Sequence, residues 1–499
     1  MKTISHYING QHHRGSSSRV GPVFSPNTGE VQANVELASA DDLEVAVSSA
    51  KEAQRDWARV NPQRRARVLF EFKRLLEVHM DELAELLSSE HGKVIADSVG
   101  DVQRGLEVIE FACGIPHLSK GEATQGAGPG IDVFSIREPL GVVAGITPFN
   151  FPAMIPMWMF GPAIAAGNAF ILKPSERDPS VPMRLAELLS EAGLPDGVLN
   201  VLNGDKDTVE GILKHPDIKA VSFVGSSDIA QSVYAMGAAH GKRMQCMGGA
   251  KNHAIVLPDA DLDQTVSDLI GAAYGSAGER CMALPVVVPV GEATADALRE
   301  KLVTEIGALR VGVSFDKEAQ YGPVVTAAHK RRIEDYIALG VEEGAELVVD
   351  GRGFTLQGYE NGFFMGPSLF DRVTPEMKSY QDEIFGPVLQ IVRSESFEDA
   401  ISLPTRHQYG NGVSIFTRNG DAAREFADQV EVGMVGINVP IPVPVSYHSF
   451  GGWKRSGFGD LNQYGMDGVR FYTRTKTVTQ RWPRSSSATG NSFVIPTME

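Results

Sequence analysis

The chain has 499 residues, and its 62 acidic and 46 basic side chains give a formal net charge of -16 at pH 7. This length predicts two to four domains, and the negative charge argues against nucleic acid or an anionic membrane surface as a partner. Three cysteines are too few and too scattered for a disulfide framework or a zinc site, so we expect a reducing compartment, the cytoplasm, and no metal. The first ten residues lack the apolar core of a signal peptide.

Short strands and turns are expected over residues 1–36, followed by three helices. Ser39 and Asp42 predict a capping box at the start of the first helix. The second helix begins at Pro62, and the third covers roughly residues 98–113. Because the third helix is apolar on two sides, Arg104 on it either extends to solvent or lines a cavity, and we expect the former.

The middle of the chain predicts an α/β domain. Residues 121–130 are rich in glycine and are expected to be a loop, and residues 131–137 alternate as a strand. Further strands with intervening helices predict a doubly wound sheet, at residues 142–146, 169–173, 198–202, 220–224 and 243–247. Residues 153–172 carry no charge and have the length of a membrane span, but Gly161, Pro162 and Gly167 favour a buried helix, a turn and a buried strand.

A second α/β section begins near Asn252, with a helix from Leu262 and a strand at residues 284–290. Residues 468–482 alternate again and are expected to pair with the strand at residues 131–137. The last segment, residues 484–499, is expected to be a disordered tail.

Cys281 lies in the segment AAYGSAGERCMAL, residues 272–284, after several small residues that let the backbone approach a ligand closely. Arg280 places a positive charge next to the sulfur, which favours the thiolate. A backbone N–H next to the sulfur is a potential donor to an oxyanion. The alternative interpretation of a lone cysteine is a buried structural residue.

Six short motifs resemble the aldehyde dehydrogenase superfamily, and they occur in that family's order over roughly residues 5–483. They are TPFNFP at 147–152, KPSE at 173–176, FVGS at 223–226, GAK at 249–251, GERC at 278–281 and EIFGP at 383–387. The resemblance implies an aldehyde dehydrogenase fold with a Rossmann-like NAD-binding domain at residues 1–120 and 140–250. It also implies an α/β catalytic domain at residues 251–455, and bridging strands at residues 121–139 and 460–483 that form an oligomerisation flap. The expected assembly is a homotetramer, a dimer of dimers.

The resemblance also implies site residues. Cys281 matches the nucleophile that forms a thioester, and Asn150 matches the side-chain donor to the oxyanion. Cofactor contacts are expected from Thr147, Phe149, Lys173, Glu176, Gly225, Ser226, Glu383 and Phe385. Among these, Lys173 and Glu176 match residues at the adenosine ribose, Ser226 matches the pyrophosphate contact at a helix start, and Glu383 matches the residue at the nicotinamide ribose. Glu176 would repel a 2′-phosphate, which favours NAD over NADP.

One position departs from the superfamily's pattern. The stretch QCMGGAK at residues 245–251 has Met247 where most members carry the glutamate that activates water to hydrolyse the thioester. A thioether accepts no proton at neutral pH, and losing a general base costs about 10²–10⁴-fold in rate. A thiol needs less activation, because its pKa is about 8.5. CoA is therefore the expected acyl acceptor.

Met247, the segment DVQRGL at residues 101–106 and the segment GGWKRS at residues 451–456 resemble the CoA-acylating methylmalonate-semialdehyde dehydrogenases. The resemblance implies oxidation of methylmalonate and malonate semialdehyde by NAD, loss of CO₂, and transfer of the acyl group to CoA. Arg104 and Arg280 are then the expected clamp for the substrate's carboxylate. Two alternatives stay open: a hydrolytic semialdehyde dehydrogenase that makes the free acid, and a catalytically inactive scaffold with the same fold.

Overall fold

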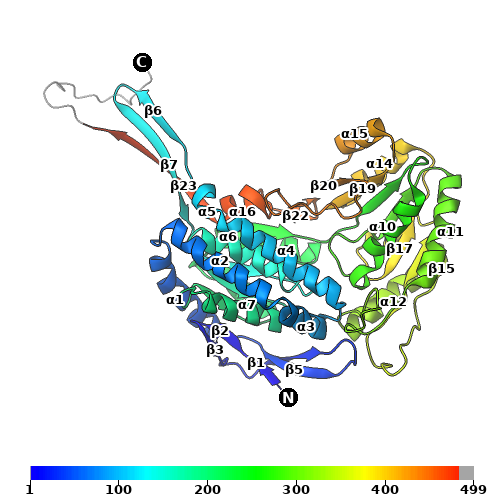
Figure 1. The fold of residues 1–499 in the computed structure, drawn as a ribbon, viewed down its shortest axis with the longest axis horizontal. Helices are drawn as coiled ribbons and strands as arrows, with labels where there is room; N and C mark the ends of the chain where they lie inside the picture. The colour runs from blue at the N-terminus through cyan, green and yellow to red at the C-terminus, as the bar shows by residue number, and fades with distance from the viewer. Residues whose placement is uncertain (1, 483–499) are drawn as a thin grey trace.

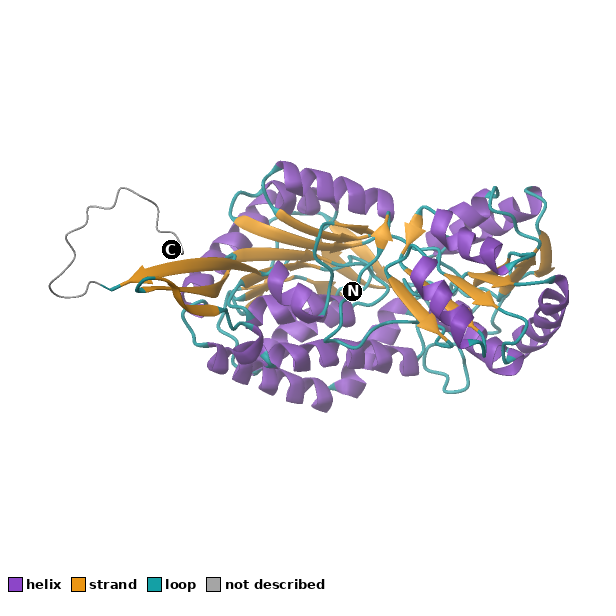
Figure 2. Cartoon of the chain, turned by 90° about the horizontal axis from the view of Figure 1, so that it is seen from above, coloured by secondary structure: helices purple, strands orange, loops and turns teal. Residues whose placement is uncertain are grey.

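The computed structural model describes residues 2–482. The predicted tail, residues 484–499, lies outside them. These residues form two lobes and an arm of strands that extends from the first lobe (Figure 1). Figure 2 shows the arm from a second direction, where it again projects from the end of the molecule that is remote from the second lobe. The lobes have separate apolar cores.

The first lobe is built on an eight-stranded sheet whose central strands are parallel. In spatial order the strands are β22 (Gly457–Phe458), β12 (Arg243–Met247), β11 (Ile218–Val224), β8 (Val142–Ile146), β9 (Ala169–Lys173), β10 (Leu199–Val201), β2 (His6–Ile8) and β3 (Gln11–His13). The chain runs from β8 outward through β9 to β10 and then returns to the other side of β8 at β11. This reversal of strand order places a topological switch point beside β8. The doubly wound sheet predicted from the sequence is confirmed.

Helices cover this sheet: α1 (Ala40–Trp57), α2 (Pro62–Val78), α3 (Met80–His91), α4 (Ile95–Cys113), α5 (Ile115–Leu118), α6 (Met154–Ala165), α7 (Ser180–Glu191), α8 (Lys206–Lys214), α9 (Ser227–Ala239) and α16 (Gly465–Phe471). The capping box of Ser39 and Asp42 is present at the start of α1. Every residue of α6 is buried, which explains its uniformly apolar sequence. Within residues 2–482, no helix combines the length and apolarity needed to cross a membrane.

The second lobe contains a seven-stranded sheet, in the order β15 (Glu346–Val349), β16 (Ser368–Asp371), β17 (Val388–Ile391), β14 (Val286–Pro289), β13 (His253–Val256), β19 (Gly412–Phe416) and β20 (Met434–Ile437). Its helices are α10 (Leu262–Tyr274), α11 (Glu292–Ala308), α12 (Ala327–Glu342), α13 (Lys378–Gln381), α14 (Phe397–Arg406) and α15 (Gly420–Gln429). Two small sheets complete the described fold, β1 (Lys2–Ile4) with β5 (Val31–Glu36) and β4 (Val20–Phe24), and β18 (Tyr409–Gly410) with β21 (Trp453–Lys454).

The arm is a three-stranded sheet of β6 (Ala123–Gly128), β7 (Ile131–Pro139) and β23 (Thr473–Arg481). The predicted pairing of the last strand with residues 131–137 is confirmed, because Thr473 lies opposite Pro139 and Arg481 opposite Ile131.

Two predictions about the segments of the arm are wrong. The glycine-rich segment 121–130 contains strand β6 rather than a loop, because its backbone pairs with β7 and a register shift between Thr124 and Gly128 accommodates the positive φ of Gly126. Residues 465–471 form α16 rather than the start of a strand, because Val469 and Phe471 are buried in the core of the first lobe.

Candidate active site

The predicted cofactor residues meet at one edge of the first sheet. Thr147, Phe149 and Asn150 follow β8, Lys173 ends β9, and Gly225 and Ser226 follow β11. Met247 ends β12, the next strand beyond β11. Ligands of open α/β sheets bind at the carboxyl ends of the strands, at the switch point of strand order. The sheet therefore brings together residues from three separate motifs, with Met247 on the next strand, at the position where a dinucleotide is expected.

Several polar groups at this edge leave hydrogen-bonding capacity for a ligand. The Oγ1 atom of Thr147 is buried without a partner among residues 2–482. Ser226 is the N-cap of α9, and its side chain makes no capping bond to that helix, which leaves the helix start open for an anion. Lys173 Nζ lies 3.2 Å from Glu176 Oε2, so both groups point to the same place beyond β9. These residues fit a bound NAD.

Cys281 follows a strained turn at the inner end of the second lobe. Ser276 and Ala277 have φ angles of 53° and 52°, and a Cβ added to Gly278 would lie 2.1 Å from the carbonyl oxygen of Gly386. Non-glycine residues with positive φ cost about 1 kcal/mol or more each, and they persist where the surroundings impose them. The turn thus fixes the approach of the chain to Cys281.

Two asparagine side chains hold the backbone of Cys281. The carbonyl oxygen of Cys281 accepts hydrogen bonds from Asn252 Nδ2 at 3.0 Å and from Asn411 Nδ2 at 3.1 Å. Asn252 also binds the backbone N–H of Gly412, which starts β19. The sulfur is therefore attached to a main chain that is tied to the central strands of the second sheet.

The thiol of Cys281 is not a preformed thiolate. Burial, with a further contribution from the charge of Glu383, raises the pKa of Cys281 to about 12. The predicted activation by Arg280 is wrong for this state, because the guanidinium donates to Asp97, with Arg280 Nη2 2.5 Å from Asp97 Oδ1. The positive charge is neutralised by this carboxylate.

The raised pKa predicts how the free enzyme reacts with iodoacetamide. Because only the thiolate is alkylated, the rate at Cys281 should rise about tenfold per pH unit between pH 7 and pH 10 and show no plateau, as the pKa lies above this range. Mass spectrometry of the labelled peptide measures this rate, and the buried Cys113 serves as an internal reference. A plateau near pH 8 would contradict the raised pKa.

Asn150 lies at the entrance to α6, and two buried charges fix its backbone. Its carbonyl oxygen accepts a hydrogen bond from Lys93 Nζ at 2.5 Å, and Lys93 also binds Asp101 Oδ2 at 3.3 Å. Asp101 Oδ1 accepts the backbone N–H of Met154 at 2.7 Å, at the first turn of α6. Lys93 and Asp101 thus join α4 to the loop that carries the predicted oxyanion donor.

A cavity of about 260 Å³ opens beside Cys281. Its wall contains the charged residues Lys93, Asp97, Asp101, Arg104 and Arg280, and the apolar residues Phe151, Met154, Met282, Ile441, Val443 and Phe450. The structure therefore places both predicted arginines in the same cavity as Cys281. The expectation that Arg104 only extends to solvent is wrong: its side chain lines the cavity and is partly exposed.

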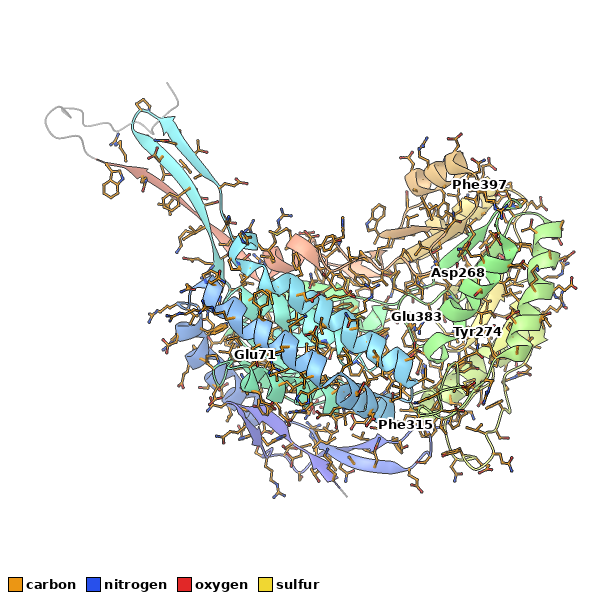
Figure 3. All side chains as sticks on the ribbon, viewed as in Figure 1. Glu71, Asp268, Tyr274, Phe315, Glu383 and Phe397 are labelled. Carbon is orange, nitrogen blue, oxygen red and sulfur yellow. The ribbon has the colours of Figure 1, made fainter. Side chains whose placement is uncertain are left out.

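Glu383 lies in the region between the two lobes (Figure 3), and Phe385 follows two residues later in the chain. Glu383 Oε1 accepts the backbone N–H of Ala250 at 2.9 Å, and burial raises the pKa of this carboxyl to about 7. The ring of Phe385 stands edge-on to the ring of Phe149, with 6.0 Å between centroids. Contacts across the two lobes thus connect the motifs at residues 147–152 and 383–387.

Sequence reasoning missed a buried acid beside two histidines. Glu279 Oε1 accepts the backbone N–H of Val325 at 3.2 Å and lies 3.5 Å from His329 Nε2, while Glu279 Oε2 is 3.9 Å from His91 Nε2. Burial raises the pKa of Glu279 to about 8 and lowers that of His329 to about 4. Both histidine rings also pack against Phe149. The cluster therefore joins the segment of Cys281 to the first lobe without adding a fixed charge.

Other functional residues that sequence reasoning missed are Lys93, Asp97, Asp101, Asn252 and Asn411. Asp97, Asp101 and Arg104 recur at helical spacing on a largely apolar helix, and this pattern was the available signal for a charged cavity wall. Asn252 directly follows Lys251 of the GAK motif, whereas nothing local marks Asn411. Tyr447 and His448, shortly before the segment GGWKRS at residues 451–456, are exposed and do not line the cavity.

Comparisons with known proteins agree with this geometry. Residues 13–478 match the sequence model of the aldehyde dehydrogenase family. A malonate-semialdehyde dehydrogenase of Pseudomonas aeruginosa is 56% identical, with 100% of both chains covered. Malonate-semialdehyde dehydrogenase 2 of Geobacillus kaustophilus is 50% identical, over 97% of this chain and 99% of the other.

Two solved structures are also similar to this chain over nearly its whole length. A methylmalonate-semialdehyde dehydrogenase of Sinorhizobium meliloti 1021, in complex with NAD, superimposes with a TM-score of 0.96 at 64% identity, over 97% of this chain and 99% of the other. A methylmalonate-semialdehyde dehydrogenase of Oceanimonas doudoroffii superimposes with a TM-score of 0.96 at 56% identity, over the same shares of the two chains.

Proposed function

Because this chain belongs to the aldehyde dehydrogenase family, we propose that it oxidises malonate and methylmalonate semialdehyde with NAD and transfers the acyl group to CoA. CO₂ is lost on the way, so the products are acetyl-CoA or propionyl-CoA, CO₂ and NADH. The observation that carries this proposal is the cavity beside Cys281, which has two arginines in its wall, in a chain with Met247 in place of the hydrolytic glutamate. The names of the relatives from Pseudomonas and Sinorhizobium support the same substrates.

The proposed NAD site combines the groups at the carboxyl edge of the first sheet. Lys173 and Glu176 would hold the adenosine ribose, Ser226 with Gly225 the pyrophosphate, and Glu383 with Phe385 the nicotinamide ribose and ring. Thr147 and Phe149 would form the wall between them. When bound, NAD accepts the hydride from the substrate carbon. Residues 1–120 and 140–250 accordingly serve as the NAD-binding domain, and residues 251–455 as the catalytic domain.

The chemistry begins at Cys281. Its thiol gives up a proton to water, the thiolate attacks the aldehyde carbon, and the resulting oxyanion is stabilised by the Asn150 amide and by a backbone N–H, that of Cys281 itself. Loss of hydride leaves a thioester whose carbonyl is β to the substrate's carboxylate. The C–CO₂ bond then breaks, its electron pair passes into the thioester as an enolate, and water donates a proton to the carbon to complete the acyl group. The CoA thiolate attacks this thioester, and Cys281 leaves as a thiolate.

Met247 explains why a thiol is the proposed acceptor. It ends β12 and is buried between β11 and β22, and its thioether takes up no proton at neutral pH. Glu383 has its pKa raised to about 7, but its Oε1 is bound to the N–H of Ala250. Thiol exchange needs less help from a base than attack by water does, since a thiol ionises at a much lower pH.

The arginine clamp predicts selective effects on acid substrates. Replacing Arg104 or Arg280 by leucine should raise KM for malonate semialdehyde about 10–100-fold, because each change removes a charge-assisted hydrogen bond to the carboxylate. KM for propanal, which has no carboxylate, should change far less. Steady-state NADH formation with both aldehydes measures the ratio.

The same experiment includes its control. Arg177 lies over the Phe149 ring on the cofactor side, 4.9 Å from the ring centroid, and is not part of the cavity wall. Arg177→Leu removes an equal charge, so it should leave the ratio of the two KM values unchanged. Equal effects of Arg104→Leu or Arg280→Leu on both aldehydes would refute the clamp.

The arm supports a proposal on assembly. Its strands β6, β7 and β23 project from the first lobe (Figure 1), and Ile136 on β7 is an exposed apolar residue. We propose that these three strands, which lie within the predicted segments 121–139 and 460–483, join subunits into a homotetramer, a dimer of dimers. The three cysteines are all free thiols, which supports a reducing compartment, the cytoplasm, as the site of action.

A further inference from the structure

Each cation in the wall of the cavity beside Cys281 is bound to an acid. Lys93 pairs with Asp101 at 3.3 Å, Arg104 with Glu107 at 3.1 Å, and Arg280 with Asp97 at 2.5 Å. The cavity is therefore close to electrically neutral before a substrate enters. A substrate carboxylate therefore competes with these acids for the same cations.

The three pairs differ in how easily they can open. The side chains of Lys93 and Asp101 are 1% and 0% exposed, and both also bind backbone groups near α6. Opening that pair would leave two buried charges without partners. The side chains of Arg280 and Asp97 are 22% and 23% exposed, so water can replace their contact. The side chains of Arg104 and Glu107 are 38% and 33% exposed, so that pair can open as well, but Glu107 does not line the cavity and so does not face a bound substrate.

The Arg280–Asp97 pair is made by one hydrogen bond. Asp97 Oδ1 accepts from Arg280 Nη2, while Asp97 Oδ2 is buried without a partner among residues 2–482. The remaining contact of the guanidinium is a long one, 3.4 Å from Arg280 Nη1 to the carbonyl oxygen of Gly271. A free carboxylate can accept two parallel N–H groups from a guanidinium, which is the stronger arrangement.

Other contacts stabilise Asp97 and Arg280 after their ion pair opens. Asp97 lies in the first turn of α4, where the helix N-terminus stabilises a negative charge. The guanidinium packs on Gly275, where an added Cβ would lie 2.6 Å from Nη1 and 2.8 Å from Cζ. Its plane is thus held next to the cavity even when its hydrogen-bond partner changes.

We propose that Asp97 is the resting counter-ion of Arg280 and that the carboxylate of the semialdehyde displaces it. Asp97 is thus a specificity-determining residue that acts through Arg280. It lowers the affinity of the empty cavity for small carboxylates. After CO₂ has left and the acyl group is uncharged, Asp97 pairs with Arg280 again. This inference rests on the proposed function, because it assigns the substrate's carboxylate to Arg280.

The test measures binding of 3-hydroxypropanoate, which has the carboxylate of malonate semialdehyde but no aldehyde. Isothermal titration calorimetry of the full-length enzyme should give a Kd about tenfold lower for Asp97→Asn than for the unchanged chain, because the competing charge is removed. Asp97→Ser gives the same comparison if the asparagine variant does not fold. In kinetics, the ratio of KM for malonate semialdehyde to KM for propanal should fall.

The matched control is Asp268→Asn. Asp268 lies on α10 (Figure 3) and lines a neighbouring cavity of about 730 Å³ that shares Asp97, Arg280 and Ile441 with the first. Its removal deletes an equal charge without touching the Arg280–Asp97 contact, so the Kd for 3-hydroxypropanoate should stay unchanged. An equal gain in affinity in this control would overturn the proposal in favour of a general field effect.

Two further outcomes separate this proposal from the proposed function. Weaker binding of 3-hydroxypropanoate by Asp97→Asn would mean that Asp97 positions Arg280 instead of competing for it, which overturns the counter-ion role alone. Arg280→Leu should weaken binding about tenfold or more. If Arg280→Leu left the Kd unchanged, Arg280 would not hold the carboxylate, and the clamp in the proposed function would fail as well.

Discussion

Without CoA, the enzyme should form about one NADH per Cys281 when it is mixed with NAD and malonate semialdehyde, and should then stop. The thioester forms because this step needs no thiol acceptor, but its hydrolysis lacks a general base, which slows deacylation by about 10²–10⁴-fold. Addition of CoA should restore continuous turnover. Stopped-flow absorbance of NADH measures the amplitude of the burst and the steady rate that follows.

Substitutions at Met247 identify the cause of the stall. Met247→Glu places a carboxylate at the end of β12, and burial there raises its pKa towards the range of a useful base. This variant should turn over without CoA at least ~10²-fold faster than the unchanged chain. Met247→Gln has a similar volume but accepts no proton, so it should keep the stall.

Formation of the free acid without CoA would contradict this mechanism. Many turnovers per active site without any thiol, with malonate as the product, would mean that another group activates water and that the hydrolytic alternative is correct. A burst well below one NADH per subunit that does not depend on CoA would also contradict the proposed order of steps.

Cys281→Ser should lower NADH formation by about 10⁴-fold or more, the order of loss seen when a catalytic nucleophile is removed. Serine keeps the size of the side chain, and the backbone carbonyl still accepts from Asn252 and Asn411, so the loop should stay in place. The hydroxyl ionises at a far higher pH than the thiol and has no base beside it. Steady-state NADH formation and calorimetric binding of NAD separate lost chemistry from lost folding.

Cys113→Ala is the control for the nucleophile. Cys113 ends α4, is buried in the core of the first lobe and lies outside the cavity wall. Its truncation should lower stability by about 1 kcal/mol and leave the burst of NADH at one per subunit. If Cys281→Ser retained a tenth of the activity, or if Cys113→Ala abolished it, Cys281 would not be the nucleophile.

The bounds of the strands that carry the site were predicted closely from the sequence. Three predicted strands, at residues 142–146, 169–173 and 243–247, coincide with β8, β9 and β12. β8 and β9 are buried on both faces, so their apolar runs are continuous and end sharply at polar motifs. The arm was harder to predict: β6 consists largely of small and polar residues, and only pairing with β7 makes it a strand.

By itself, the sequence determined the order of the motifs and predicted the nucleophile and the missing base at residue 247, because each depends on which residue type stands at which place in a motif. Only the tertiary structure decided the state of the charges. Arg280 is adjacent to Cys281 in the chain, yet its guanidinium binds Asp97 of α4, and burial raises the pKa of the thiol. Electrostatics depends on distance and solvent exposure in three dimensions, and neither can be read from neighbours in the sequence.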